Sequence, residues 1–322
     1  MRSYLGLLIG VAMLIGTSMV VADTDYFIPS VVGSSAKSVR LGNVNGFSNV
    51  ADSVFDNPAA LFRVNKFSSS LFSTTFMEEV NYQNFSVAVR VPQGVLAVGF
   101  MSAGVDGIPK TKKNVFDSTI SASDPNNYEL YSDSTFTYRN QMVKVAYELS
   151  QNKYLHLGIS GSYFSTVMDT YSATGFNADA GVAIESGPLS ISIVAKNVIP
   201  SLKATYTNSE SPTYNQTESL PLETIYGARY KMDSVTIMGQ VDIKESNKKL
   251  LKAFGVEYAP PFLKLLRLSM GYKEFVVVKE IKTNMTMGLG LELGGVNFDY
   301  AYEQSDHIMF NNKHYFSVGL SF

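Results

Sequence analysis

The sequence contains no cysteine, so a lipid-modified N-terminus, a disulfide framework and a thiolate metal site are all excluded. It has only three histidines, His156, His307 and His314, and their spacing fits no metal site or nucleophile-base pair. Charged residues make up 17% of the chain and the formal net charge is −2, which gives no sign of a basic surface for nucleic acid. We therefore expect no metal, no cofactor, no nucleic-acid partner and no enzymatic activity.

Long hydrophobic runs are also missing, except at the start of the chain. A positive residue, Arg2, precedes an apolar stretch from Leu5 to Ile15, and a V-x-A site ends at Ala22. This pattern predicts a secretory signal peptide over residues 1–22. The alternative is an N-terminal anchor helix, but the apolar stretch is shorter than the roughly 20 residues that a spanning helix needs. No later segment is long enough and apolar enough to predict a membrane-spanning helix.

After residue 65 the sequence becomes a series of short segments in which apolar and polar residues alternate. In the segment 296–303, for example, Val296, Phe298 and Tyr300 share one face and Asn297 and Asp299 share the other. A period of two is typical of strands with one apolar and one polar face. The segments that follow this pattern are 67–76, 81–91, 94–103, 135–149, 153–166, 175–186, 188–197, 220–232, 234–243, 251–260, 264–274, 283–293, 295–303 and 313–322.

The connections between these segments differ in length in a regular way. Every second connection is tight, such as Pro92-Gln93, Asp233 and Gly294, whereas the others are longer and polar, above all 104–134 and 198–219. Outer-membrane barrels have short periplasmic turns and long extracellular loops. We therefore predict an all-β fold, a transmembrane antiparallel β-barrel of about fourteen strands in the bacterial outer membrane, with its long loops extracellular.

Charged residues recur on the polar face of the predicted strands. This face points into the lumen of a membrane barrel. Two interpretations are open: the charges could line a selective passage, or they could form a structural network of ion pairs. The residues concerned are Arg90, Lys144, Glu148, Asp179, Asp242, Glu292 and Asp299.

The last predicted strand ends on an aromatic residue, Phe322, and Phe316, Val318 and Leu320 share its face. This pattern is similar to the insertion signal that the barrel-assembly machinery reads. We therefore expect that machinery as a partner during insertion, and outer-membrane lipid as the partner of the outer face. Because tryptophan is absent, Tyr and Phe must supply any aromatic girdle.

The segment before the strands does not alternate. Residues 41–61 read LGNVNGFSNVADSVFDNPAAL, with a glycine-rich start, an Ala-Asp pair and an Asn-Pro-Ala sequence. This resembles the N-terminal motif of the FadL-like family of outer-membrane barrels, which includes fatty-acid transporters and the PorV and PorQ proteins of the type IX secretion system. The departures are Ala60, where the family has glycine, and Asn43 and Asn45 in the glycine-rich stretch. The principal matching residues are Gly42, Gly46, Asp52, Asn57, Pro58 and Ala59.

The resemblance implies that residues 23–66 form a plug inside a barrel of residues 67–322. Independently of the family, Asn57 before Pro58 favours an extended or turn conformation, and irregular backbone at membrane depth must be shielded from lipid. The alternative for this segment is a flexible periplasmic leader. The resemblance further implies passage of a hydrophobic ligand such as a long-chain fatty acid. The alternative function is a PorV-like shuttle, whose partner would be a secreted protein.

Overall fold

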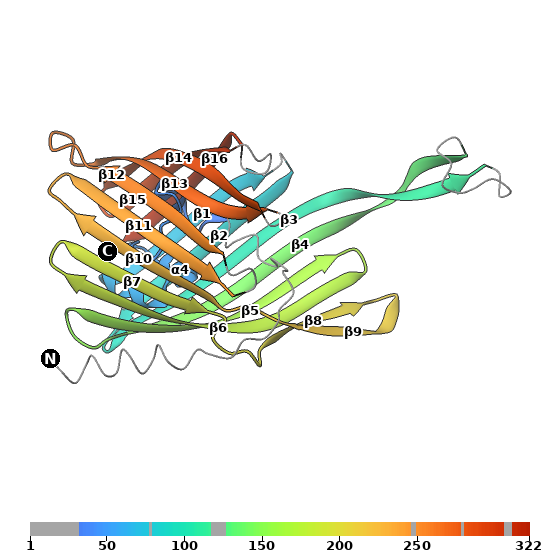
Figure 1. The fold of residues 1–322 in the computed structure, drawn as a ribbon, viewed down its shortest axis with the longest axis horizontal. Coiled ribbons are helices and arrows are strands. Elements are labelled where there is room, and N and C mark those ends of the chain that lie inside the picture. Colours follow the sequence, from blue (N-terminus) through green and yellow to red (C-terminus); the bar gives the residue numbers. More distant parts are fainter. Residues whose placement is uncertain (1–31, 77–78, 117–126, 246–248, 278–279, 306–310) are drawn as a thin grey trace.

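The computed structural model describes residues 32–76, 79–116, 127–245, 249–277, 280–305 and 311–322. These residues form a closed antiparallel barrel with an internal N-terminal segment (Figure 1). The predicted signal peptide over residues 1–22 and the first part of the predicted plug, 23–31, lie outside the described residues. No helix in the described parts of the chain is long and apolar enough to cross a membrane.

Fourteen of the sixteen described strands form the ring, and β8 (Lys203–Asn208) and β9 (Ser211–Ser219) form a hairpin beside it. Neighbours along the chain pair with each other, except that β7 pairs with β10, and β1 pairs with β16 to close the ring. The predicted fold class and strand number are therefore confirmed. The strands of the ring are β1 (Phe67–Phe76), β2 (Val80–Val91), β3 (Gly94–Val115), β4 (Tyr128–Ser150), β5 (Leu155–Met168), β6 (Tyr171–Ser186), β7 (Leu189–Lys196), β10 (Glu223–Lys231), β11 (Val235–Lys244), β12 (Leu250–Tyr258), β13 (Leu266–Val277), β14 (Glu280–Leu293), β15 (Val296–Ser305) and β16 (Lys313–Ser321).

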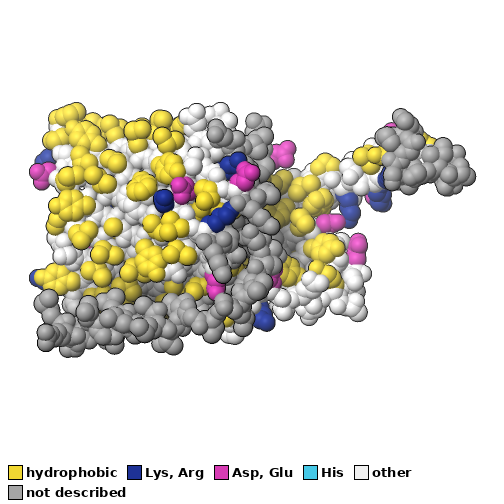
Figure 2. Space-filling model, in the orientation of Figure 1, with side chains coloured by type: hydrophobic (Ala, Val, Ile, Leu, Met, Phe, Trp, Pro, Cys, Tyr) yellow, Lys and Arg dark blue, Asp and Glu magenta, His cyan; other side chains and the backbone are white. Residues whose placement is uncertain are grey.

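The apolar side chains of the strands form a continuous outer surface. Across four neighbouring strands, Leu71 faces Phe85, Phe85 faces Phe100, and Phe100 faces Val143, and all four side chains are exposed. Figure 2 shows hydrophobic side chains covering the wall of the barrel on the side in view. A wall with this pattern is suited to hydrocarbon, because every second side chain points outward along each strand.

One end of the barrel, here called the hairpin end, carries extensions beyond the ring. Strands β3 and β4 stay paired to Val115 and Tyr128, although β2 pairs with β3 only to Gly104 (Figure 1). The prediction of a loop over 104–134 is therefore wrong for most of its length. The predicted loop over 198–219 is also wrong, because it contains the β8–β9 hairpin, which pairs with the first residues of β6.

The other end, here called the turn end, carries tight connections such as those between Val91 and Gly94 and between Leu293 and Val296. The predicted alternation of short and long connections therefore corresponds to the two ends of one barrel. That the turn end faces the periplasm stays a prediction.

Residues 32–66, here called the luminal segment, lie inside the ring. The segment contains helix α3 (Ala36–Arg40), helix α4 (Ser53–Asp56) and the 3-10 helix η1 (Pro58–Arg63). Ser35 begins α3 by accepting a hydrogen bond from the Ser38 backbone at 3.2 Å. Helix α3 contacts β13 to β16, whereas η1 contacts β3 to β6, so opposite walls of the barrel hold the two halves of the segment.

Candidate functional site

The Asn-Pro-Ala sequence joins the luminal segment to β6 and β7. The side chain of Asn57 is fully buried, and its amide nitrogen donates to Ser192 at 2.8 Å and to the carbonyls of Val182 and Ile193 at 3.3 Å. Its amide oxygen accepts from the Ala59 backbone at 2.9 Å, while Pro58 starts η1. Asn57 therefore acts as the N-cap of η1 and as its attachment to the wall.

The two predicted motif glycines occupy turns that need their conformation. Gly42 and Gly46 have φ of +71° and +80°, a region that favours glycine. A Cβ on Gly42 would stand 2.5 Å from the carbonyl oxygens of Phe254 and Tyr272. The luminal backbone therefore lies directly against β12 and β13 at this point.

Two carboxyl groups of the luminal segment are buried. Asp52 and Asp56 are 1% and 6% exposed, and Asp56 accepts a hydrogen bond from Ser34 at 2.9 Å. Both residues belong to the luminal segment and not to a membrane-spanning strand, since Asp52 is the N-cap of α4 and Asp56 is its last residue. Burial raises the pKa of Asp56 to about 7, with a further contribution from Asp52, while the hydrogen bond from Ser34 lowers it. Burial also raises the pKa of Asp52.

The sequence interpretation missed Arg40, which is the principal charged anchor of the luminal segment. Its guanidinium lies 2.8 Å from Glu257 and 3.1 Å from Asp299, and it donates to Ser269 at 2.8 Å. Arg40 is 1% exposed, so its charge depends on these two carboxylates. The predicted lumen residue Asp299 is thus an ion-pair partner of the luminal segment.

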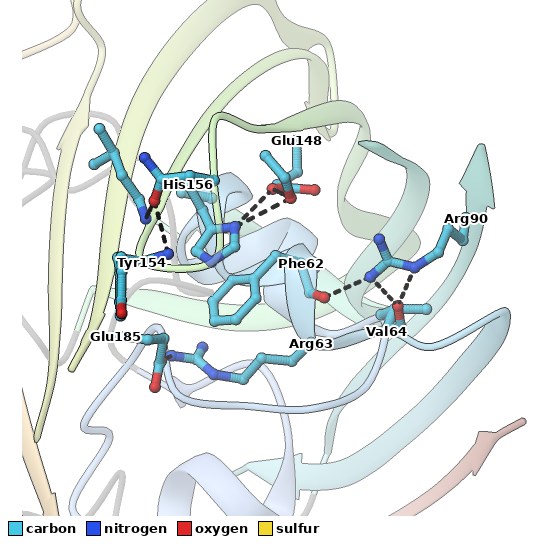
Figure 3. A network of polar contacts seen from close by, with 12 residues as sticks. Phe62, Arg63, Val64, Arg90, Glu148, Tyr154, His156 and Glu185 are labelled. Carbon is cyan, nitrogen blue, oxygen red and sulfur yellow. Dashed lines mark hydrogen bonds and ion pairs between the residues drawn. The ribbon is translucent and has the colours of Figure 1, made fainter. Parts of the chain in front are cut away.

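At the turn end, Arg90 holds the chain that leaves η1 (Figure 3). Its guanidinium donates to the backbone carbonyls of Phe62, Val64 and Asn65. This predicted lumen residue therefore binds backbone that precedes the first strand.

Two further contacts hold η1 in the same region (Figure 3). Phe62 stacks on His156 with ring centroids 3.6 Å apart, and His156 Nδ1 lies 3.2 Å from Glu148. Arg63 forms an ion pair with Glu185. The predicted residue Glu148 therefore supports a ring that packs against the luminal segment.

The other predicted lumen charges also lie near opposite charges, and Asp242 interacts electrostatically with Lys196 and Lys244. Lys144 pairs with Asp179, and both side chains are buried. Glu292 pairs with Arg267 at 2.9 Å. These contacts indicate that Lys144, Asp179, Glu292 and Arg267 form structural ion pairs and do not line a selective passage. Paired charges largely cancel each other's electrostatic potential, so they attract a permeating ion only weakly.

On the inner wall, aromatic and methionine side chains pack against the luminal segment, among polar side chains such as Lys273 and Glu303. Phe72 lies between Tyr315, stacked at 6.1 Å, and Tyr82, edge-on at 5.6 Å. With Val32, Ala36 and Val39 of the luminal segment these side chains form one buried cluster. The surface called here the apolar inner wall consists of Phe72, Tyr82, Met101, Met142, Phe164, Phe275 and Tyr315.

A cavity of about 50 Å³ lies beside this wall, between the luminal segment and β10 to β13. Its polar lining includes Asn43, Glu223, Gln240 and Asp242, and its apolar lining includes Phe275. The Asn45 backbone donates to Gln240 at 2.7 Å at the edge of the cavity. The predicted residue Asp242 thus lines an internal space.

The predicted assembly-signal residues lie on β16 and at the end of the chain. Phe316, Val318 and Phe322 are exposed, and β16 pairs with β1 at the closure of the ring. Their use by an assembly machinery stays a prediction. Among the described residues, no group of three or more His, Cys, Asp or Glu side chains could hold a metal ion.

Solved structures provide the comparison with known proteins. The chain is similar to the CymD monoaromatic hydrocarbon channel and to the Pseudomonas putida toluene transporter TodX, in both cases with a TM-score of 0.58 and 11% identity. These matches cover 90% of this chain and 98% and 99% of those chains. A Pseudomonas aeruginosa FadL homologue matches with a TM-score of 0.53 and 9% identity, covering 89% of this chain and 95% of that chain.

No protein-family model and no curated protein sequence matches the chain. The structural matches confirm the FadL-like resemblance at the level of the fold. The chain therefore shares its fold with these proteins.

Proposed function

We propose that this barrel conducts hydrophobic small molecules across the outer membrane. The observation that supports the proposal most directly is the apolar inner wall, with Phe72, Tyr82 and Tyr315 at its centre. A barrel for polar solutes has a polar, water-filled interior, whereas this interior contains a buried cluster of aromatic and methionine side chains. Long-chain fatty acids and monoaromatic hydrocarbons are the two substrate classes that we would test first.

The luminal segment separates the apolar inner wall from the turn end. Its attachments are an ion-pair cluster at Arg40 and the contacts of η1 with Arg90, His156 and Glu185. Because these attachments are spread over both walls, passage requires a local displacement of the segment. A plug that moves only when a ligand binds would keep the barrel closed to polar solutes.

The absence of tryptophan allows a direct binding experiment. In Phe164→Trp, the single indole would report on the apolar inner wall. In the control Phe176→Trp, the indole would lie on the exposed outer surface. Toluene and oleate would be titrated into each protein in lipid nanodiscs while the tryptophan fluorescence is recorded.

The proposal predicts a saturable change in the fluorescence of the Phe164→Trp protein, and only a linear partition response in the Phe176→Trp protein. Linear responses of both proteins to both compounds would overturn it. Binding of a co-expressed secreted protein by a barrel that gives no saturable response would instead favour the shuttle function.

A further inference from the structure

The cavity beside the apolar inner wall contains an acceptor without a partner. Oδ1 of Asp242 is buried and accepts no hydrogen bond from the residues that the structure describes. Gln240, on the same strand, accepts from the Asn45 backbone through its amide oxygen and also hydrogen-bonds the carboxyl group of Asp242, which still leaves Oδ1 without a donor. A buried carboxylate oxygen that accepts no hydrogen bond raises the free energy of the folded state. A ligand that donates a hydrogen bond to this oxygen would therefore be stabilised there.

The charges around this oxygen do not favour a ligand that carries a full charge. The charged residues that line the cavity are Glu223, Asp242, Lys244 and Lys273, and Lys196 also interacts with Asp242. Lys273 is committed to Glu303 at a distance of 2.6 Å, and Lys244 also has a contact. Burial of an additional unpaired charge among these groups would be unfavourable. A neutral donor satisfies Asp242 without that cost.

Part of the cavity lining is apolar and meets the apolar inner wall at Phe275. Leu251 and Ala253 line it and are 7% and 5% exposed, and Phe275 belongs both to the cavity and to the wall. A volume of about 50 Å³ holds a few water molecules or one small head group. The site therefore combines a small polar end with an apolar surface for the remainder of a ligand.

From this arrangement we infer that the cavity binds the hydroxyl group of an amphipathic compound, such as a phenol or a long-chain alcohol, which donates its hydrogen to Asp242. The apolar part of the ligand lies along Phe275 and the apolar inner wall. This inference rests on the proposed function and specifies its substrate class. It makes Asp242 a specificity-determining residue, whereas the fluorescence experiment above tests apolar binding alone.

Toluene and p-cresol form a matched pair for the test, because p-cresol is toluene with one added hydroxyl group. Both would be titrated into the Phe164→Trp protein and into the same protein with Asp242→Asn or Asp242→Ala. The control is Glu292→Gln, which changes a luminal carboxylate that pairs with Arg267 and is not part of the cavity lining. Retention of the barrel would be checked by heat-dependent mobility on gels.

We expect p-cresol to bind about ten- to a hundredfold tighter than toluene, the range for a hydrogen bond to a charged group. Asp242→Ala should remove this preference and leave toluene binding unchanged, Asp242→Asn should reduce it, and Glu292→Gln should keep it. Equal binding of the two compounds, or a preference that survives Asp242→Ala, would overturn the inference but leave the proposed function intact. Failure of both compounds to bind would also overturn the inference, and the proposed function would be contradicted only if oleate failed to bind as well.

Discussion

The amide oxygen of Asn57 occupies the space that a side chain on Gly181 would need. A Cβ built on Gly181 would stand 1.9 Å from Asn57 Oδ1, so glycine is required on β6 at this point. The adjacent strand shows the same relationship, since a Cβ on Gly158 would stand 2.2 Å from the Ala59 backbone nitrogen. The Asn-Pro-Ala turn thus packs directly against Gly181 and Gly158. A larger residue at either position tests whether this contact attaches the luminal segment to the wall.

Gly181→Ala should displace Asn57 and loosen the luminal segment. The loss of its buried hydrogen bonds should reduce the free energy of unfolding by about 1–3 kcal/mol. The measurement is guanidinium unfolding in detergent, together with limited proteolysis of the segment. Gly161→Ala is the matched control, because a Cβ there has its nearest neighbour at 3.9 Å. Equal stability and equal proteolysis of the two variants would contradict this account.

Arg40→Met should be strongly destabilising. It leaves Glu257 and Asp299 without their shared cation, and breaking a buried ion pair by removing one partner costs about 3–5 kcal/mol. Arg139→Met, in the exposed pair with Asp106, should cost less than about 1 kcal/mol. Similar unfolding midpoints for the two variants would show that Arg40 does not anchor the segment.

The attachment of the luminal segment should weaken as the pH rises. The pKa of Asp56 increases from 3.8 to about 7 on folding, so the folded state binds more protons between these values. Stability contributed by protonated Asp56 is therefore present at low pH and is lost as the pH approaches 7. Asp56→Asn should flatten this dependence in proteolysis measured from pH 4 to pH 8, while Asp106→Asn on the exposed hairpin should not. A wild-type profile without a slope would refute the prediction.

Removal of the projecting part of β3 and β4 should leave the barrel intact. The pairing of β3 with β2 ends at Gly104 and that of β4 with β5 ends at Tyr138, so residues 106–137 can be replaced by a short turn without loss of strand pairing in the ring. The exposed ion pair of Lys110 with Asp169 would be lost, and such a pair contributes less than about 1 kcal/mol. The shortened protein should keep its heat-dependent gel mobility and its binding of hydrophobic compounds. Failure to insert or fold would show that the projecting hairpin is part of the barrel's stability.

The alternation of apolar residues was sufficient to predict the ring, because lipid on one side imposes a period of two on every strand. The first strand was predicted over 67–76, as the structure has it. The pattern failed beyond the ring, where both faces of a ribbon lie in water and no alternation is required. This is why the continuation of β3 to Val115 and the hairpin of β8 and β9 were interpreted as loops.

The partners of the luminal segment could not be predicted in the same way. Arg40 and Asp299 are 259 positions apart, and no local pattern relates them. The family motif drew attention to Asn57, but its contacts with Ser192 and Gly181 depend on how the closed barrel places β6 and β7. Sequence spacing therefore identified the luminal charges as a group without assigning their pairs.

Transport of hydrophobic compounds would be measured as the rate at which labelled toluene and oleate enter cells that display this barrel in their outer membrane. The rate would be compared with that of cells lacking the barrel and of cells with an equal amount of Met142→Lys, which places a charge on the apolar inner wall. We expect faster uptake of at least one compound with the unaltered barrel, and a loss of that gain with Met142→Lys. Equal uptake in all three would contradict this expectation.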